Sequence, residues 1–163
     1  MPIATATALL NGYWDRKLPV NPTHIAQRLG ITVVPELSLV GGASGLIEEA
    51  GGLTTIRYDM TEPTVRQRFT VAHELGHFSL QHLNEGQRCF RDTKAQFFSH
   101  QVDPRETAAN QFAAELLMPR DVVEYLVQEH GLRDVSRLAN LFHVSEAAMG
   151  FRLKNLALAH LNV

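Results

Sequence analysis

The chain has 163 residues, which is enough for one domain with a buried core. Its composition, 45% hydrophobic and 20% charged, excludes an intrinsically disordered chain. The sequence contains no run of about eighteen apolar residues, the length that could span a membrane. A formal net charge of −2 provides no overall attraction to nucleic acid or anionic lipid. The single cysteine, Cys89, and an N-terminus unlike a signal peptide lead us to expect one cytoplasmic domain over residues 1–163.

The first third of the chain predicts one short helix and then a small sheet. After a loose start, residues 21–31 (NPTHIAQRLGI) combine a Pro-Thr opening, apolar residues at helical spacing and a glycine stop. Three short runs rich in β-branched residues follow, separated by Gly and Pro: ITVVPEL, SGLIEEA and GLTTIRYD. Such runs are typical of a small antiparallel sheet.

The pattern becomes helical from Thr61 onward. Thr61 can cap a helix, Pro63 suits its first turn, and apolar residues then follow at helical spacing as far as Gly76. The polar segment from Asn84 to Pro104 is predicted to be a long loop. The order helix, sheet, helices indicates an α+β fold with a mostly helical C-terminal part. Further helices are expected over residues 104–117, 119–130, 135–142 and 145–158.

The stretch FTVAHELGHFSLQH carries an HExxH motif within the long helix that begins near Thr61. His73 and His77 lie about 40° apart around this helix, so both imidazoles can bind one metal ion. Glu74 projects beside them and can act as general base toward the water that such an ion activates. This is the arrangement of zinc hydrolases, and the small sheet is expected to pack against this zinc-binding helix.

A catalytic zinc site needs a third protein ligand. The metzincin pattern is excluded, because Leu83 stands where its third histidine belongs. In PRETAANQFAAELLMP, Glu106 heads a stripe that becomes apolar at its far end, so it is predicted to face inward as the ligand. Asn110, one turn later, can accept a hydrogen bond from a ligand histidine. Glu115, about 180° round the helix, is predicted to face water.

The two motifs together resemble the ImmA/IrrE family of zinc metallopeptidases, in which HExxH is paired with an ExxxNxFAxxLLMP-type helix. The similarity covers most of the chain, including VNPTHIAQRLGITVV and LANLFHVSEAAMGFRLKNL. Many relatives carry a second acidic residue where this chain has Ala108. Since that position lies about 200° from the ligand glutamate on the helix, little effect on zinc is expected.

The resemblance implies a zinc-dependent endopeptidase that binds one Zn²⁺ through His73, His77 and Glu106 and uses Glu74 as general base. It also implies a typical substrate, a helix-turn-helix repressor of the Xre type. Cleavage of such a repressor relieves transcriptional repression, for example in a stress response.

Other residues carry weaker hypotheses. Tyr58 and His100 are candidates for oxyanion or substrate contacts, although a packing tyrosine and a solvated histidine are the competing interpretations. Cys89 could bind the metal or sense oxidation, but an uninvolved thiol is favoured. The segment CFRD is a candidate edge strand for pairing with substrate main chain. His82, about 140° from His77 on a continued helix, is predicted to be a surface or helix-end histidine.

Two alternative functions stay open at this point. The C-terminal helices, at about residues 134–158, have the spacing of a helix-turn-helix, which would suit a DNA-binding regulator. Direct nucleic-acid binding is disfavoured, because the second helix opens with Glu146 and carries only Arg152 and Lys154. The other alternative is a metal-dependent toxin neutralised by an Xre-type antitoxin. The sequence does not decide between protease and toxin, nor does it give the oligomeric state.

Overall fold

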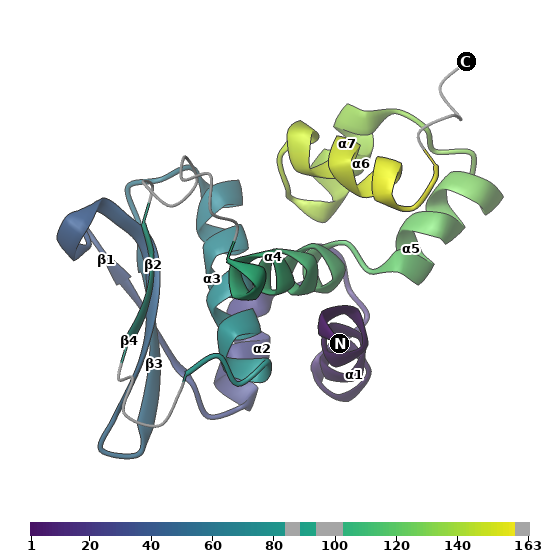
Figure 1. The fold of residues 1–163 in the computed structure, drawn as a ribbon. Coiled ribbons are helices and arrows are strands. Elements are labelled where there is room, and N and C mark those ends of the chain that lie inside the picture. The colour runs from purple at the N-terminus through teal and green to yellow at the C-terminus, as the bar shows by residue number, and fades with distance from the viewer. Residues whose placement is uncertain (84–88, 94–102, 159–163) are drawn as a thin grey trace.

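The computed structural model describes residues 1–83, 89–93 and 103–158. They form an α+β fold in which a small sheet lies at one end and helices make up the rest (Figure 1). The helices of the described part are α1 (Pro2–Tyr13), α2 (Pro22–Arg28), α3 (Thr64–Ser79), α4 (Pro104–Leu117), α5 (Arg120–Glu124), α6 (Val135–Phe142) and α7 (Glu146–Asn155). A 3-10 turn (Val40–Gly42) and a π-helical turn (Tyr125–Glu129) complete them, and no helix in these ranges could cross a membrane.

The sheet has four strands in the order β1-β3-β2-β4. Their bounds are β1 (Thr32–Glu36), β2 (Ala43–Ala50), β3 (Leu53–Asp59) and β4 (Cys89–Thr93). β2 runs antiparallel to both of its neighbours, whereas β1 pairs parallel with β3. The sheet is therefore mixed, and the expectation of a purely antiparallel sheet is wrong for this pair. The reason is that β3 returns from a tight hairpin into the space between β1 and β2, so that it runs in the direction of β1.

The hairpin between β2 and β3 has a two-residue loop formed by Gly51 and Gly52. Both glycines have positive φ, 60° and 79°, which is the backbone that a type I′ turn requires. The hairpin fixes the register in which Gly45 pairs with Tyr58.

Three local expectations from the sequence need correction. The start of the chain is the helix α1, and it is held by packing of Ala6 and Leu10 into the core rather than by any capping signal. Thr61 does not cap α3, because its backbone and hydroxyl both donate to Asp59 Oδ1, at 2.8 and 2.6 Å. The segment expected to be one long loop contains β4, which confirms the predicted edge strand for the backbone of Cys89–Thr93.

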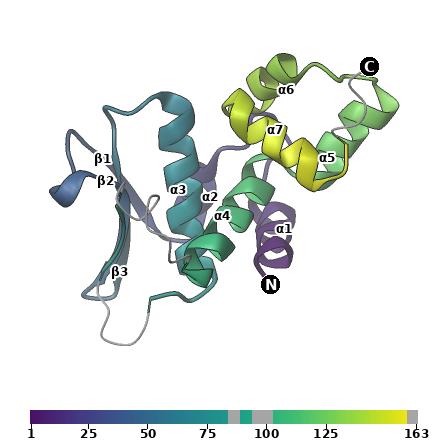
Figure 2. The ribbon, with the colours of Figure 1, turned by 45° about the horizontal axis from the view of Figure 1, so that its top comes forward.

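α3 is the central element of the fold. It lies between the sheet and α4, and both views show α1 on the far side of α4 (Figures 1 and 2). Every residue from Thr70 to His77 is buried, so the HExxH motif lies inside the protein and not on its surface. A Cβ added at Gly76 would lie 3.0 Å from Phe112 Cδ1 and 3.3 Å from the Ala109 backbone. The glycine therefore permits the close approach of α3 and α4.

The C-terminal helices lie away from the sheet (Figure 2). A buried ion pair joins them to α4. Glu115 accepts a hydrogen bond from the Arg152 guanidinium on α7, and both side chains are almost fully buried. Arg152 also donates to the Met118 carbonyl at 3.0 Å, and Glu115 accepts from the Arg120 backbone at 3.1 Å. The expectation that Glu115 faces water is therefore wrong, because its partner lies 37 residues away in sequence.

Removing one partner of this pair should destabilise the protein strongly. Glu115→Ala leaves the Arg152 charge buried without compensation, so we expect a loss of about 3–5 kcal/mol in the free energy of unfolding. Denaturant unfolding followed by circular dichroism measures this value. Glu124→Ala is the matched control, because it removes the more exposed pair with Arg120 and should cost less than about 1 kcal/mol. Equal losses in the two variants would contradict the assignment of Glu115 to the core.

Candidate metal centre

Three side chains from α3 and α4 converge on one point. His73 and His77 are buried on α3, and Glu106, in the first turn of α4, is 18% exposed. The two Nε2 atoms lie 2.9 Å apart, and the Glu106 carboxylate lies 3.1 Å from His73 Nε2 and 3.5 Å from His77 Nε2. One ligand atom from each residue falls within 4.8 Å of the others. The predicted ligand residues are thus brought together as a group that could hold a metal ion.

The hydrogen bond between His73 and Asn110 directs the Nε2 lone pair of His73 toward this point. Its Nδ1 lies 3.0 Å from Asn110 Oδ1, a carbonyl oxygen that can only accept. Nδ1 therefore carries the proton in the neutral ring, and Nε2 presents a lone pair toward His77 and Glu106. Asn110 occupies the orienting position that the sequence predicts for it.

His77 receives a similar contact from a residue beyond the helix. His82 Nδ1 lies 2.9 Å from His77 Nδ1, and the two rings meet edge to face with centroids 5.0 Å apart. α3 ends at Ser79, and Gln81 has a positive φ of 58°, so the chain turns back on itself. The angle calculated for a continued helix therefore does not apply. His82 is the helix-end histidine that the sequence predicts, but its contact with His77 was not predicted.

The charge states at the site are those that metal binding requires. Burial lowers the pKa of His77, and the nearby Glu106 carboxylate only partly opposes this. Burial would raise the pKa of Glu106, but its contacts with the rings of His73 and His77 outweigh burial and lower it to about 2. At neutral pH, His77 is therefore neutral and Glu106 is ionised, as metal ligands must be.

The donor set fits zinc. Two imidazole nitrogens and one carboxylate, with space left for a fourth ligand, are the donors of known catalytic zinc sites. Glu106 Oε1 is buried and accepts no hydrogen bond from the described residues. A cation bound at this point would satisfy this buried oxygen.

Glu74 is fully buried and lies between α3 and the sheet. A Cβ added at Gly45 of β2 would lie 2.9 Å from Glu74 Oε1 and only 2.3 Å from Thr70 Cγ2. β2 has a register shift between Ala43 and Gly45, typical of a β-bulge, at the same place. The strand backbone thus confines the Glu74 side chain, and only glycine permits this approach. A glycine within a strand-like run was the sequence signal for this contact.

Of the two candidates for oxyanion or substrate contacts, one can be placed. Tyr58 is half-buried on β3 and packs against the main core. As the register partner of Gly45, it projects from the same face of the sheet as the Glu74 contact. Its role toward an oxyanion stays a prediction. His100 and the Cys89 side chain lie outside the described residues.

The comparison with known families agrees with this geometry. Residues 26–154 match the model of peptidase family M78, described as the IrrE N-terminal-like domain. The matched range includes both α3 and α4, and therefore all three candidate ligands and Glu74. Among curated proteins, none matched the sequence. The resemblance that rests on the two motifs is confirmed.

The contact between His82 and His77 predicts a measurable effect on metal affinity. In His82→Ala the His77 ring loses the partner that fixes its orientation, so zinc affinity should fall about 10–100-fold. Competition with a chromophoric chelator measures the affinity. His130→Ala, which removes an exposed histidine after the π-helical turn, should bind zinc like the wild type. Equal affinity of His82→Ala and wild type would show that His82 does not orient His77.

Proposed function

The chain belongs to the IrrE N-terminal-like peptidase family, and from this premise we propose that it is a zinc-dependent endopeptidase. The observation that carries the proposal is the convergence of His73, His77 and Glu106 within 4.8 Å, with Glu74 adjacent in the sequence. A family of peptidases and a buried two-histidine, one-carboxylate group point to the same chemistry, the hydrolysis of a peptide bond.

In this proposal each residue of the site has one role in the hydrolysis. A zinc ion held by the three ligands would act as a Lewis acid toward water and toward the peptide carbonyl. Glu74 would take a proton from the attacking water and later give it to the departing amine, so that the products are a carboxylic acid and an amine, which become carboxylate and ammonium at neutral pH. Asn110 and His82 would hold the two ligand rings in position.

An extended peptide could bind along the sheet. β4 is the last strand in the order β1-β3-β2-β4, so one of its edges has no neighbour among the described strands. An exposed edge offers backbone donors and acceptors to an added strand. We propose that substrate main chain pairs there, beside the strand that contacts Glu74.

For the substrate itself, we propose an Xre-type helix-turn-helix repressor or antitoxin. The family membership supports this class, and the reaction would then release the genes that the repressor silences. A DNA-binding role for the α6–α7 pair is disfavoured by the position of Arg152. This residue is 5% exposed and is engaged by Glu115 and by the Met118 carbonyl, so it does not reach toward phosphate.

The proposal predicts that metal binding and cleavage can be separated. Glu74→Gln keeps all three ligands, so it should retain zinc, while the loss of the base should lower cleavage of a candidate repressor by about 10²–10⁴-fold. Zinc content and the rate of cleavage, followed by mass spectrometry, give both values. A chelator should abolish wild-type cleavage, and added zinc should restore it. Wild-type cleavage rates in Glu74→Gln, or turnover that persists in chelator, would contradict the mechanism.

A further inference from the structure

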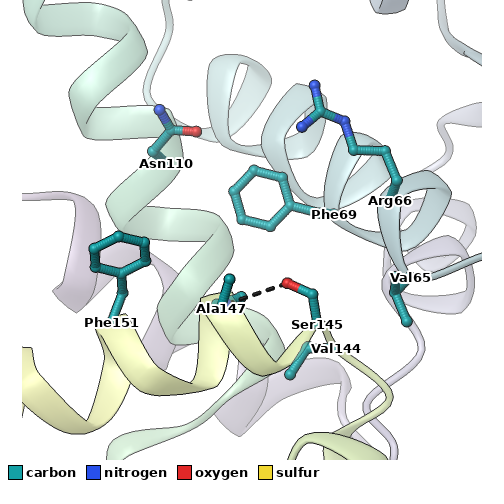
Figure 3. A pocket seen from close by; sticks show the side chains of 9 residues that line it. Val65, Arg66, Phe69, Asn110, Val144, Ser145, Ala147 and Phe151 are labelled. Carbon is teal, nitrogen blue, oxygen red and sulfur yellow. Dashed lines mark hydrogen bonds between the residues drawn. The ribbon is translucent and has the colours of Figure 1, made fainter. Parts of the chain in front are cut away.

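A cavity of about 460 Å³ lies between α3, α4 and α7, and we name it the α3–α7 cavity (Figure 3). Its size falls within the range of about 300–1,000 Å³ that is typical of ligand sites. Phe69 from α3 and Phe151 from α7 project into it from different sides, as Figure 3 shows. Val65, Val144 and Ala148 complete an apolar lining.

The α3–α7 cavity shares a wall with the metal centre. Asn110 lines the cavity, and its Oδ1 is the acceptor for His73 Nδ1, at 3.0 Å. Phe69 also lines it, and its ring centroid lies 6.3 Å from that of His73. An extended peptide advances only about 3.3 Å per residue. A side chain in the cavity would therefore belong to a residue a few positions from a bond at the metal centre.

The lining residues select by polarity as well as by size. Among the described residues that line the cavity, Arg66 alone is charged, and none is acidic. A lysine or arginine side chain would meet no carboxylate there, whereas a leucine, methionine or phenylalanine would bury its surface against two aromatic rings. Phe151 is 68% exposed, so a bound apolar side chain would also remove its ring from water.

We propose that the α3–α7 cavity is the subsite that receives a large apolar side chain of the substrate, from a residue within a few positions of the peptide bond that is cut. This inference rests on the proposed peptidase function and adds its side-chain specificity. The site depends on α7, so the C-terminal helices form one wall of the substrate cleft.

The first test is a specificity profile. The zinc-loaded full chain is incubated with a mixture of random peptides, and mass spectrometry identifies the cleaved bonds. Leucine, methionine or phenylalanine should be enriched at one fixed position near the cut. Replacing that residue by alanine in a single peptide should lower kcat/KM at least about tenfold.

Variants then assign this preference to the cavity. Ala147→Trp places a large ring into the cavity from an exposed position of α7, and Phe151→Ala removes one apolar wall. Both should lose most of the enrichment and keep the zinc affinity and melting temperature of the wild type. Leu53→Ala, which removes an exposed apolar side chain from β3, is the matched control and should keep the preference. An unchanged preference in both cavity variants would overturn the proposal.

A second measurement does not depend on cleavage. N-acetylphenylalanine amide is titrated into zinc-loaded Glu74→Gln protein, and binding is followed by NMR. Saturable shifts should appear at Phe69 and Phe151, should vanish in Ala147→Trp, and should be absent with N-acetyllysine amide. No shift with the phenylalanine amide would overturn the apolar site. Binding of this amide, together with no cleavage of any peptide by the wild type, would count against the peptidase function and not against the apolar site.

The oligomeric state tests whether a second copy of the chain, and not a substrate side chain, fills the cavity. Sedimentation should give the same mass for the wild type and Phe151→Glu. A wild-type dimer that Phe151→Glu dissociates would overturn the proposal, since the cavity would then be an interface between two copies.

Discussion

The close packing of α3 against α4 is the constraint on which the site depends. Gly76 lets the two helices approach until the position of its missing Cβ lies 3.3 Å from the Ala109 backbone. This contact places Glu106, one helical turn before Asn110, within 3.1 Å of His73. The same approach brings Asn110 behind the His73 ring. One helix pair thus supplies all three candidate ligands and one of the groups that orient them, and both helices carry buried residues of the main core.

The two sides of α3 have different tasks. Its α4 side gathers two neutral imidazoles and one carboxylate, a set whose charges a divalent cation can balance inside the protein. Its sheet side carries Glu74, which lies against the bulged part of β2. Position 45 of this strand has no space for a side chain and is occupied by glycine. The helix geometry therefore separates the three candidate ligands from Glu74, the proposed general base, and keeps this carboxylate out of the candidate ligand group. α7 closes the cleft beyond Asn110 and brings the apolar wall that we assign to substrate selection.

Local helix geometry explains what the sequence could predict. The side of its helix on which each of His73, His77, Glu106 and Asn110 lies follows from helical spacing and from the start of α4, which the Asp103 cap and Pro104 mark clearly. That the two helices meet is expected from the pairing of the two motifs. Other contacts between distant segments could not be predicted, because no motif links the segments that make them. Glu115 is buried because of Arg152 on another helix, and His82 reaches His77 because the helix ends and the chain turns at Gln81. The parallel pairing of β1 with β3 likewise depends on the return of a hairpin and not on the pattern within either strand.

Zinc titration of the metal-free chain tests the central claim, that His73, His77 and Glu106 form one metal site. We expect one zinc per wild-type chain. Glu106→Ala should bind zinc more than about a hundredfold less tightly, a loss larger than the 10–100-fold typical of residues that only orient a ligand. Glu124→Ala, which removes a carboxylate from α5 instead, should match the wild type. Zinc binding by Glu106→Ala with wild-type affinity would contradict the account, because α4 would then contribute no ligand.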